Sequence, residues 1–201
     1  MRRVLLFLFL SLALVACGNT AQLPQQNDVR NALLRNPLYA EYYYDDLTQQ
    51  MVNLALKGDP ILNEPRIQQL VDRTRNRSLE HANEAIDAQF EGSMGLFISE
   101  RELVGGEVLV HNNTLYFGPN FNAAPGPSLE VFLTTVLDPR DAEFPDDSAV
   151  NLGLLQNQYG TQSVSIPDHP RTGTGRLKTV VLWDTELDLL YGFAQLEKRI
   201  L

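Results

Sequence analysis

The spacing of apolar residues changes near Phe90, and this change restricts the chain to a mixed architecture. Before that point apolar residues recur every three or four positions, which predicts helices. After it, short alternating runs are separated by glycine and proline, which predicts antiparallel strands. With one cysteine no intrachain disulfide can form, so packing must hold the fold together. We expect a mainly β, α+β protein: an antiparallel β-sandwich or barrel with an N-terminal αα-hairpin.

The predicted helical hairpin covers residues 39–89. Its first helix contains AEYYYDDLTQQMVNLALKG, and its second begins at Pro65, a residue suited to the first turn of a helix. The apolar pattern of the second helix is interrupted near Arg77 and Ser78, so a bend or break there is an open alternative. The tyrosines at 42–44 could stack on a ligand or form a packing edge, and the packing edge is favoured.

The predicted β-domain covers residues 90–201. Two short runs around His111-Asn112-Asn113 indicate a β-hairpin. Further strands are predicted in the stretches SLEVFLTTVL, TQSVSIP, RLKTVVLWD and LDLLYGFAQL.

The first 17 residues resemble the start of a bacterial lipoprotein. Arg2 and Arg3 precede an apolar run from Val4 to Ala16 that is too short to cross a bilayer comfortably, which is typical of a signal peptide. Leu14-Val15-Ala16-Cys17 is similar to a lipobox, and the resemblance implies cleavage after residue 16 and lipid attachment at Cys17. An uncleaved anchor helix and a plain secretory signal remain the alternatives.

Residues 17–38 are rich in asparagine, glutamine and small residues, which predicts a lipidated flexible tether. Because cleavage would remove Arg2 and Arg3, the formal net charge would fall from −9 to −11. An acidic surface repels phosphates, so nucleic acid is not an expected partner. The expected location is the cell envelope, outside the cytoplasm, on the outer membrane or the cell surface.

Five pieces follow one another in the last 110 or so residues: FEGSMG, GGEVLV, LYFGPNFNAAPGPSLEVFLT, VNLGLLQNQYGTQSVSIP and LKTVVLWDTELDLLYGFAQL. In their order and spacing these pieces resemble the DM-thirteen domain, a module found beside DOMON domains and alone in many bacterial lipoproteins. The resemblance implies a β-domain and a role in electron transfer through a cysteine directly after the tryptophan of the penultimate strand. Here Trp183 is followed by Asp184, so a thiol-based redox role is not carried over.

Three residues form the candidate pocket: Trp183, Asp184 and Tyr191. Strand alternation places Trp183 and Asp184 on opposite faces. Asp184 could line a pocket if it occupies the family's cysteine position, or it could cap a turn with Thr185, and the cap is favoured.

An acidic loop is a weak Ca²⁺ candidate, since Ca²⁺ prefers oxygen ligands, but a solvated loop is the favoured interpretation. Its carboxylates belong to Asp138, Asp141, Glu143, Asp146 and Asp147. The three histidines, His81, His111 and His169, lie far apart in the sequence and do not predict a metal site. No other cofactor is expected.

Two functions remain open. The favoured one is a non-catalytic binding or interaction module, anchored to the membrane by its N-terminal lipid, with an unknown small ligand or envelope protein as partner. The alternative is an accessory redox protein of the DM-thirteen type with a non-thiol cofactor site. No assembled nucleophile, acid–base pair or metal set indicates an enzyme.

Overall fold

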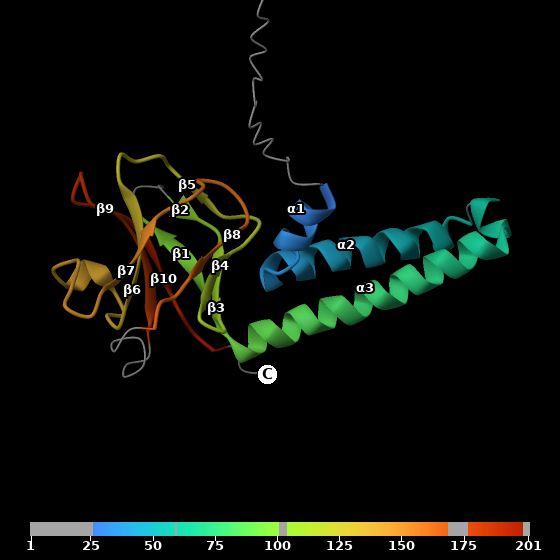
Figure 1. The fold of residues 1–201 in the computed structure, drawn as a ribbon, viewed down its shortest axis with the longest axis horizontal. Coiled ribbons are helices and arrows are strands. Elements are labelled where there is room, and N and C mark those ends of the chain that lie inside the picture. The colour runs from blue at the N-terminus through green and yellow to red at the C-terminus, as the bar shows by residue number, and fades with distance from the viewer. Residues whose placement is uncertain (1–25, 59, 101–103, 169–176, 199–201) are drawn as a thin grey trace, which may run out of the picture.

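A computed structural model describes the protein over residues 26–58, 60–100, 104–168 and 177–198. These residues form an antiparallel β-structure preceded by a helical hairpin (Figure 1). The expected fold class, mainly β with an N-terminal αα-hairpin, is therefore confirmed.

Each of the two long helices begins at a proline. Asn36 caps the first of these helices, because its Oδ1 accepts hydrogen bonds from the backbone N–H groups of Leu38 at 3.0 Å and Tyr39 at 3.4 Å. Pro65 occupies the first turn of the other. The helices are α1 (Gln26–Leu33), α2 (Pro37–Leu56), the short 3-10 helix η1 (Pro60–Asn63) and α3 (Pro65–Glu91).

The prediction of a tether over residues 17–38 is wrong in its described part. The chain is helical from Gln26, and both Asn36 and Leu38 are buried. The composition indicated a polar linker, but the stretch also contains a few apolar residues at helical spacing, Val29 and Leu33 among them, which line a cavity beside the edge of the sheet. Cys17 and the expected signal peptide at 1–16 lie outside the described residues.

Helix α3 is continuous past Arg77 and Ser78, so the alternative of a break there is wrong. The small residues that interrupt the apolar pattern lie in the contact between the two helices. Ser78 is buried, as are Ala82 and Ala85, and these small side chains let α2 and α3 approach closely along their length.

The sheet is antiparallel throughout and strongly curved. Its eight described strands run in the order β7-β6-β9-β10-β1-β3-β4-β8, and β2 and β5 form a separate pair. Positive φ angles at Asn112 and Asn113 make the tight β3–β4 turn, which confirms the predicted hairpin. The strands are β1 (Ser93–Ser99), β2 (Val104–Gly105), β3 (Glu107–His111), β4 (Thr114–Phe117), β5 (Asn122–Ala123), β6 (Leu129–Thr134), β7 (Val150–Leu154), β8 (Gln162–Ser165), β9 (Thr179–Asp184) and β10 (Leu189–Gln195).

Apolar residues pack on both faces of the central strands. On β9, Leu182 belongs to the main core inside the curve, whereas Val181 belongs to a smaller cluster on the other face. Phe144 covers that second cluster from the segment between β6 and β7. Because both faces are covered, the central strands are apolar nearly throughout rather than cleanly alternating.

The hairpin meets the sheet at one end and projects away from it at the other (Figure 1). At the joined end, the side-chain Nδ2 of Asn36 donates a hydrogen bond to the carbonyl oxygen of Phe117 on β4 at 2.8 Å. None of the helices in the described ranges is long and apolar enough to cross a bilayer.

Candidate binding cleft beside the helical hairpin

Trp183, Asp184 and Tyr191 are not brought together in one pocket. Trp183 packs on the smaller cluster, with its ring centroid 5.1 Å from that of Phe144. Asp184 and Tyr191 lie on the other face, where Tyr191 is part of the main core. The alternation predicted for β9 is confirmed, and it separates Trp183 from Asp184 and Tyr191.

Asp184 caps the turn between β9 and β10. The side chain is 0% exposed, and its Oδ1 accepts hydrogen bonds from the backbone N–H groups of Glu186 at 3.1 Å and Leu187 at 3.0 Å. Its Oδ2 accepts from the backbone N–H of Ser128 at 3.2 Å. Asp184 was predicted either to line a pocket or to cap a turn, and these contacts are those of a turn cap.

Tyr191 lies next to this carboxylate in a tightly packed setting. Its hydroxyl donates to the carbonyl oxygen of Pro125 at 3.1 Å. Burial, with a smaller effect of the Asp184 charge, raises the pKa of Tyr191. A Cβ at Gly126 would overlap both the Asp184 carboxylate and the Tyr191 hydroxyl, so side-chain and backbone atoms fill the space around this pair.

The acidic loop is held by hydrogen bonds within the protein. Asp138 pairs with Arg140 at 2.6 Å, and this contact holds the pKa of Asp138 below its usual range. Asp146 accepts from the hydroxyl of Thr134 at 2.6 Å and from Ser148. Asp141, Glu143 and Asp147 are exposed. Within the described ranges, no group of three or more His, Cys, Asp or Glu side chains is placed to hold a metal ion.

The described histidines pair with glutamates on the surface. His81 Nδ1 lies 2.9 Å from Glu84 on the same helix, and His111 Nε2 lies 3.1 Å from Glu91. His169 lies outside the described residues.

A cleft of about 630 Å³ lies between α2 and the segment that follows β4. Four carboxylates line it: three come from α2 and the fourth is Glu107 at the start of β3. Tyr42 contributes a ring that is 63% exposed. The remaining lining residues are uncharged, and the full lining is Leu38, Glu41, Tyr42, Asp45, Asp46, Thr48, Gln49, Glu107, Pro119 and Asn120.

Two of the four carboxylates contact residues from other elements. Gln89 of α3 is 1% exposed, and its Nε2 donates to Glu41 Oε2 at 2.6 Å. Glu107 lies over Gly118, where a Cβ would overlap its carboxylate. A glycine at 118 is therefore required for the observed position of Glu107.

The cleft concentrates negative charge where water is partly excluded. Burial, together with the nearby charge of Glu41, raises the pKa of Glu107 above its usual range. No lysine or arginine belongs to the described lining. A cation bound between these carboxylates would relieve their mutual repulsion, and the exposed Tyr42 ring offers it a π-face.

The tyrosine triplet therefore serves two purposes. Tyr43 and Tyr44 pack edge-to-face with centroids 5.3 Å apart, as the packing-edge interpretation predicts. Tyr42 faces the cleft instead. The cleft was not predicted, because Glu107 lies more than 60 positions from the α2 carboxylates in the sequence. The adjacent YDD of residues 44–46 was the one local signal for it.

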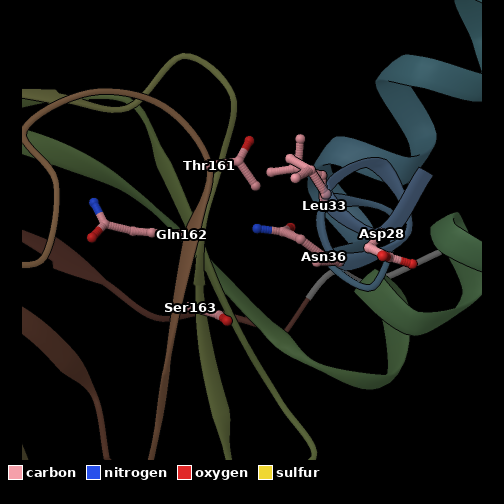
Figure 2. A pocket seen from close by; sticks show the side chains of 8 residues that line it. Asp28, Leu33, Asn36, Thr161, Gln162 and Ser163 are labelled. Atoms are coloured by element: carbon pink, nitrogen blue, oxygen red, sulfur yellow. The ribbon is translucent and has the colours of Figure 1, made fainter. Parts of the chain in front are cut away.

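A second cavity, of about 420 Å³, lies between α1 and the edge strand β8. Figure 2 shows Leu33 of α1 on one side of it and Thr161 on the other, while Gln162 points away. The two cavities flank the segment where Asn36 joins the helices to the sheet.

Comparisons with protein-family models, with curated proteins and with solved structures found no match to this chain. The resemblance to the DM-thirteen domain and to bacterial lipoproteins therefore stays a prediction.

Proposed function

We propose that this protein is a non-catalytic binding module, anchored by lipid at Cys17 on the outer side of a membrane, that binds organic cations in the cleft beside α2. The observation that carries the proposal is the set of four carboxylates that line one cavity without a basic residue among the lining. The class of ligand we expect is an exposed lysine or arginine side chain of an envelope protein.

The chemistry of the lining favours an organic cation over a metal ion. Among the described residues, these carboxylates included, no three or more His, Cys, Asp or Glu side chains lie close enough together to hold a metal ion. An ammonium or guanidinium group suits this looser arrangement, because its charged head donates several hydrogen bonds while its apolar stem packs on nonpolar surface. Leu38, Tyr42 and Pro119 offer apolar surface for such a stem.

Isothermal titration calorimetry of the full chain with tetralysine tests this proposal. We expect saturable binding that weakens as salt is added, because screening reduces the attraction between exposed charges. Glu107→Gln and Glu41→Gln should each lower the affinity at least threefold. Glu186→Gln, which removes an exposed carboxylate on the β9–β10 turn, is the matched control and should leave it unchanged.

Equal affinity for tetralysine in all of these variants would contradict the cleft as the site, since general surface charge would then explain the binding. No binding of tetralysine at low salt would contradict the proposed ligand class.

The anchor is tested separately by Cys17→Ser. We expect this variant to leave the membrane fraction, because the lipid is the proposed attachment. If the variant stays in the membrane fraction after a salt wash, the proposed lipid anchor is wrong.

A further inference from the structure

Among the described residues, the outer edge of β8 pairs with no other strand. In the described part of the chain, β8 is the last strand of the sheet and has β4 as its one strand neighbour. Its four residues, QSVS, include no charge and no proline. Natural edge strands usually carry such features, or a bulge, that prevent pairing with another chain.

The hydrogen-bond pattern shows which residues of this strand face outward. The N–H of Ile166 donates to the carbonyl oxygen of Asn113 at 2.8 Å, and that of Gly160 donates to Phe121 at 2.8 Å. Backbone groups of an antiparallel strand point alternately to its two edges. The backbone N–H and C=O groups of Ser163 and Ser165 therefore point away from β4, and both residues are exposed.

The opposite edge of the sheet is different. The pairing of β6 with β7 is irregular between Val131 and Phe132, and Gly153 of β7 has a φ of +97°. A bulge of this kind twists an edge and interrupts a regular row of donors and acceptors. Of the two described edges, β8 is the one suited to a further strand.

The cavity between α1 and β8 lies beside this edge. Val29, Ala32 and Leu33 provide an apolar wall, and Val29 is 46% exposed. Asp28 is the one charged residue of the lining, so charge complementarity disfavours an acidic occupant. The side chains of Thr161 and Ser163 border the cavity from the strand side (Figure 2).

We propose that β8 binds an extended, non-acidic peptide segment of a partner protein as an added strand. The peptide backbone pairs with the outward groups of Ser163 and Ser165, and every second side chain of the peptide faces the α1 side of the sheet. An apolar side chain at that position enters the cavity against Val29 and Leu33. This surface is separate from the acidic cleft and does not depend on the proposed function.

The probe is a blocked hexapeptide, acetyl-Thr-Val-Thr-Val-Thr-Val-amide, added to the isotope-labelled full chain and followed by NMR. We expect amide shifts centred on Ser163 and Ser165, with slower hydrogen exchange at both. A peptide N-methylated at every residue has no residue N–H left to donate from either edge, and it should bind at least tenfold more weakly.

Two variants at one position separate backbone from side chain. Ser163→Pro removes the outward N–H and should abolish binding, whereas Ser163→Ala keeps that N–H and should bind as the wild type does. Val29→Asp, in the apolar wall, should weaken binding. If Ser163→Pro fails to fold, the N-methylated peptide still tests the same hydrogen bonds.

Three results would overturn the proposal. They are the absence of shifts at β8 with millimolar peptide, equal binding of the N-methylated peptide, and a protein dimer in sedimentation that Ser163→Pro dissociates. The dimer would mean that a second copy occupies the edge. Glu107→Gln should leave peptide binding unchanged, so the two sites can fail independently.

Discussion

The side chain of Asn36 bonds to the backbone of both parts of the protein. Its Oδ1 caps α2 by accepting from the backbone N–H groups of Leu38 and Tyr39, and its Nδ2 donates to the carbonyl oxygen of Phe117 on β4 at 2.8 Å. Asn36 is 3% exposed. One buried amide therefore both starts the hairpin and attaches it to the sheet beside the two cavities.

Asn36→Ala should lower the free energy of unfolding by about 2 kcal/mol, because it removes a helix cap and the buried hydrogen bond that joins the hairpin to β4. Asn36→Ser keeps an oxygen for the cap but cannot reach Phe117, so its loss should be smaller. Urea unfolding measures both. Asn83→Ala, at an exposed position of α3, is the control. A loss below about 0.5 kcal/mol for Asn36→Ala would contradict the attachment role.

Asp184→Ala should lower the free energy of unfolding by roughly 3 kcal/mol, because three backbone N–H groups lose the buried carboxylate that accepts from them. Glu186→Ala, in the same turn but exposed, should stay within about 0.5 kcal/mol of the wild type. Chemical denaturation compares the two. Similar stability for both variants would show that the turn does not depend on the Asp184 carboxylate.

Asp146 should make stability depend on acid. Burial alone would raise its pKa, but hydrogen bonds from Ser148 and Thr134 outweigh that effect and lower it. The stabilisation is therefore present above the ordinary aspartate value of about 3.9 and is lost as the pH falls through the lower folded value. Asp146→Asn should therefore destabilise the protein at pH 7, and the loss should shrink as the pH falls below the ordinary aspartate value.

Thermal unfolding across this pH range measures the effect of Asp146, with Asp147→Asn as the exposed control. A difference between wild type and Asp146→Asn that stays constant with pH would show that the hydrogen bonds do not favour the ionised carboxylate.

Ionisation of Glu107 should lower the stability of the folded protein, whereas ionisation of Asp146 should raise it. Because the pKa of Glu107 is raised, the ionised carboxylate destabilises the folded protein above the folded pKa, and this cost disappears below the unfolded value. Glu107→Gln should therefore raise the unfolding temperature at pH 7 and change it less at pH 4. A lower unfolding temperature at pH 7 would show that the ionised Glu107 is stabilised in the cleft.

Much of the fold could be predicted from local patterns in the sequence. Helical spacing and Pro65 predicted the hairpin, and the Asn112-Asn113 turn predicted the β3–β4 pair. The strands β1, β2, β5 and β7 and the helix α1 were not predicted. Gly153 weakens the strand pattern of β7, and α1 lies in a stretch whose composition is mostly polar.

The candidate site was less accessible to sequence reasoning than the fold. Trp183 and Asp184 are adjacent in sequence, but strand alternation sends their side chains to opposite faces. Glu41 and Glu107 are distant in sequence and meet only when the hairpin docks on β4. Long-range contacts of this kind leave no local spacing to recognise.

The most direct test of the cation cleft is a two-dimensional NMR titration of the isotope-labelled full chain with tetralysine. Binding in the cleft predicts that the largest amide shifts cluster at Tyr42, Glu107 and Gly118, and that Glu107→Gln reduces them at every ligand concentration. Shifts spread evenly over the acidic surface, or centred on the loop that holds Asp138 and Asp146, would contradict the central claim.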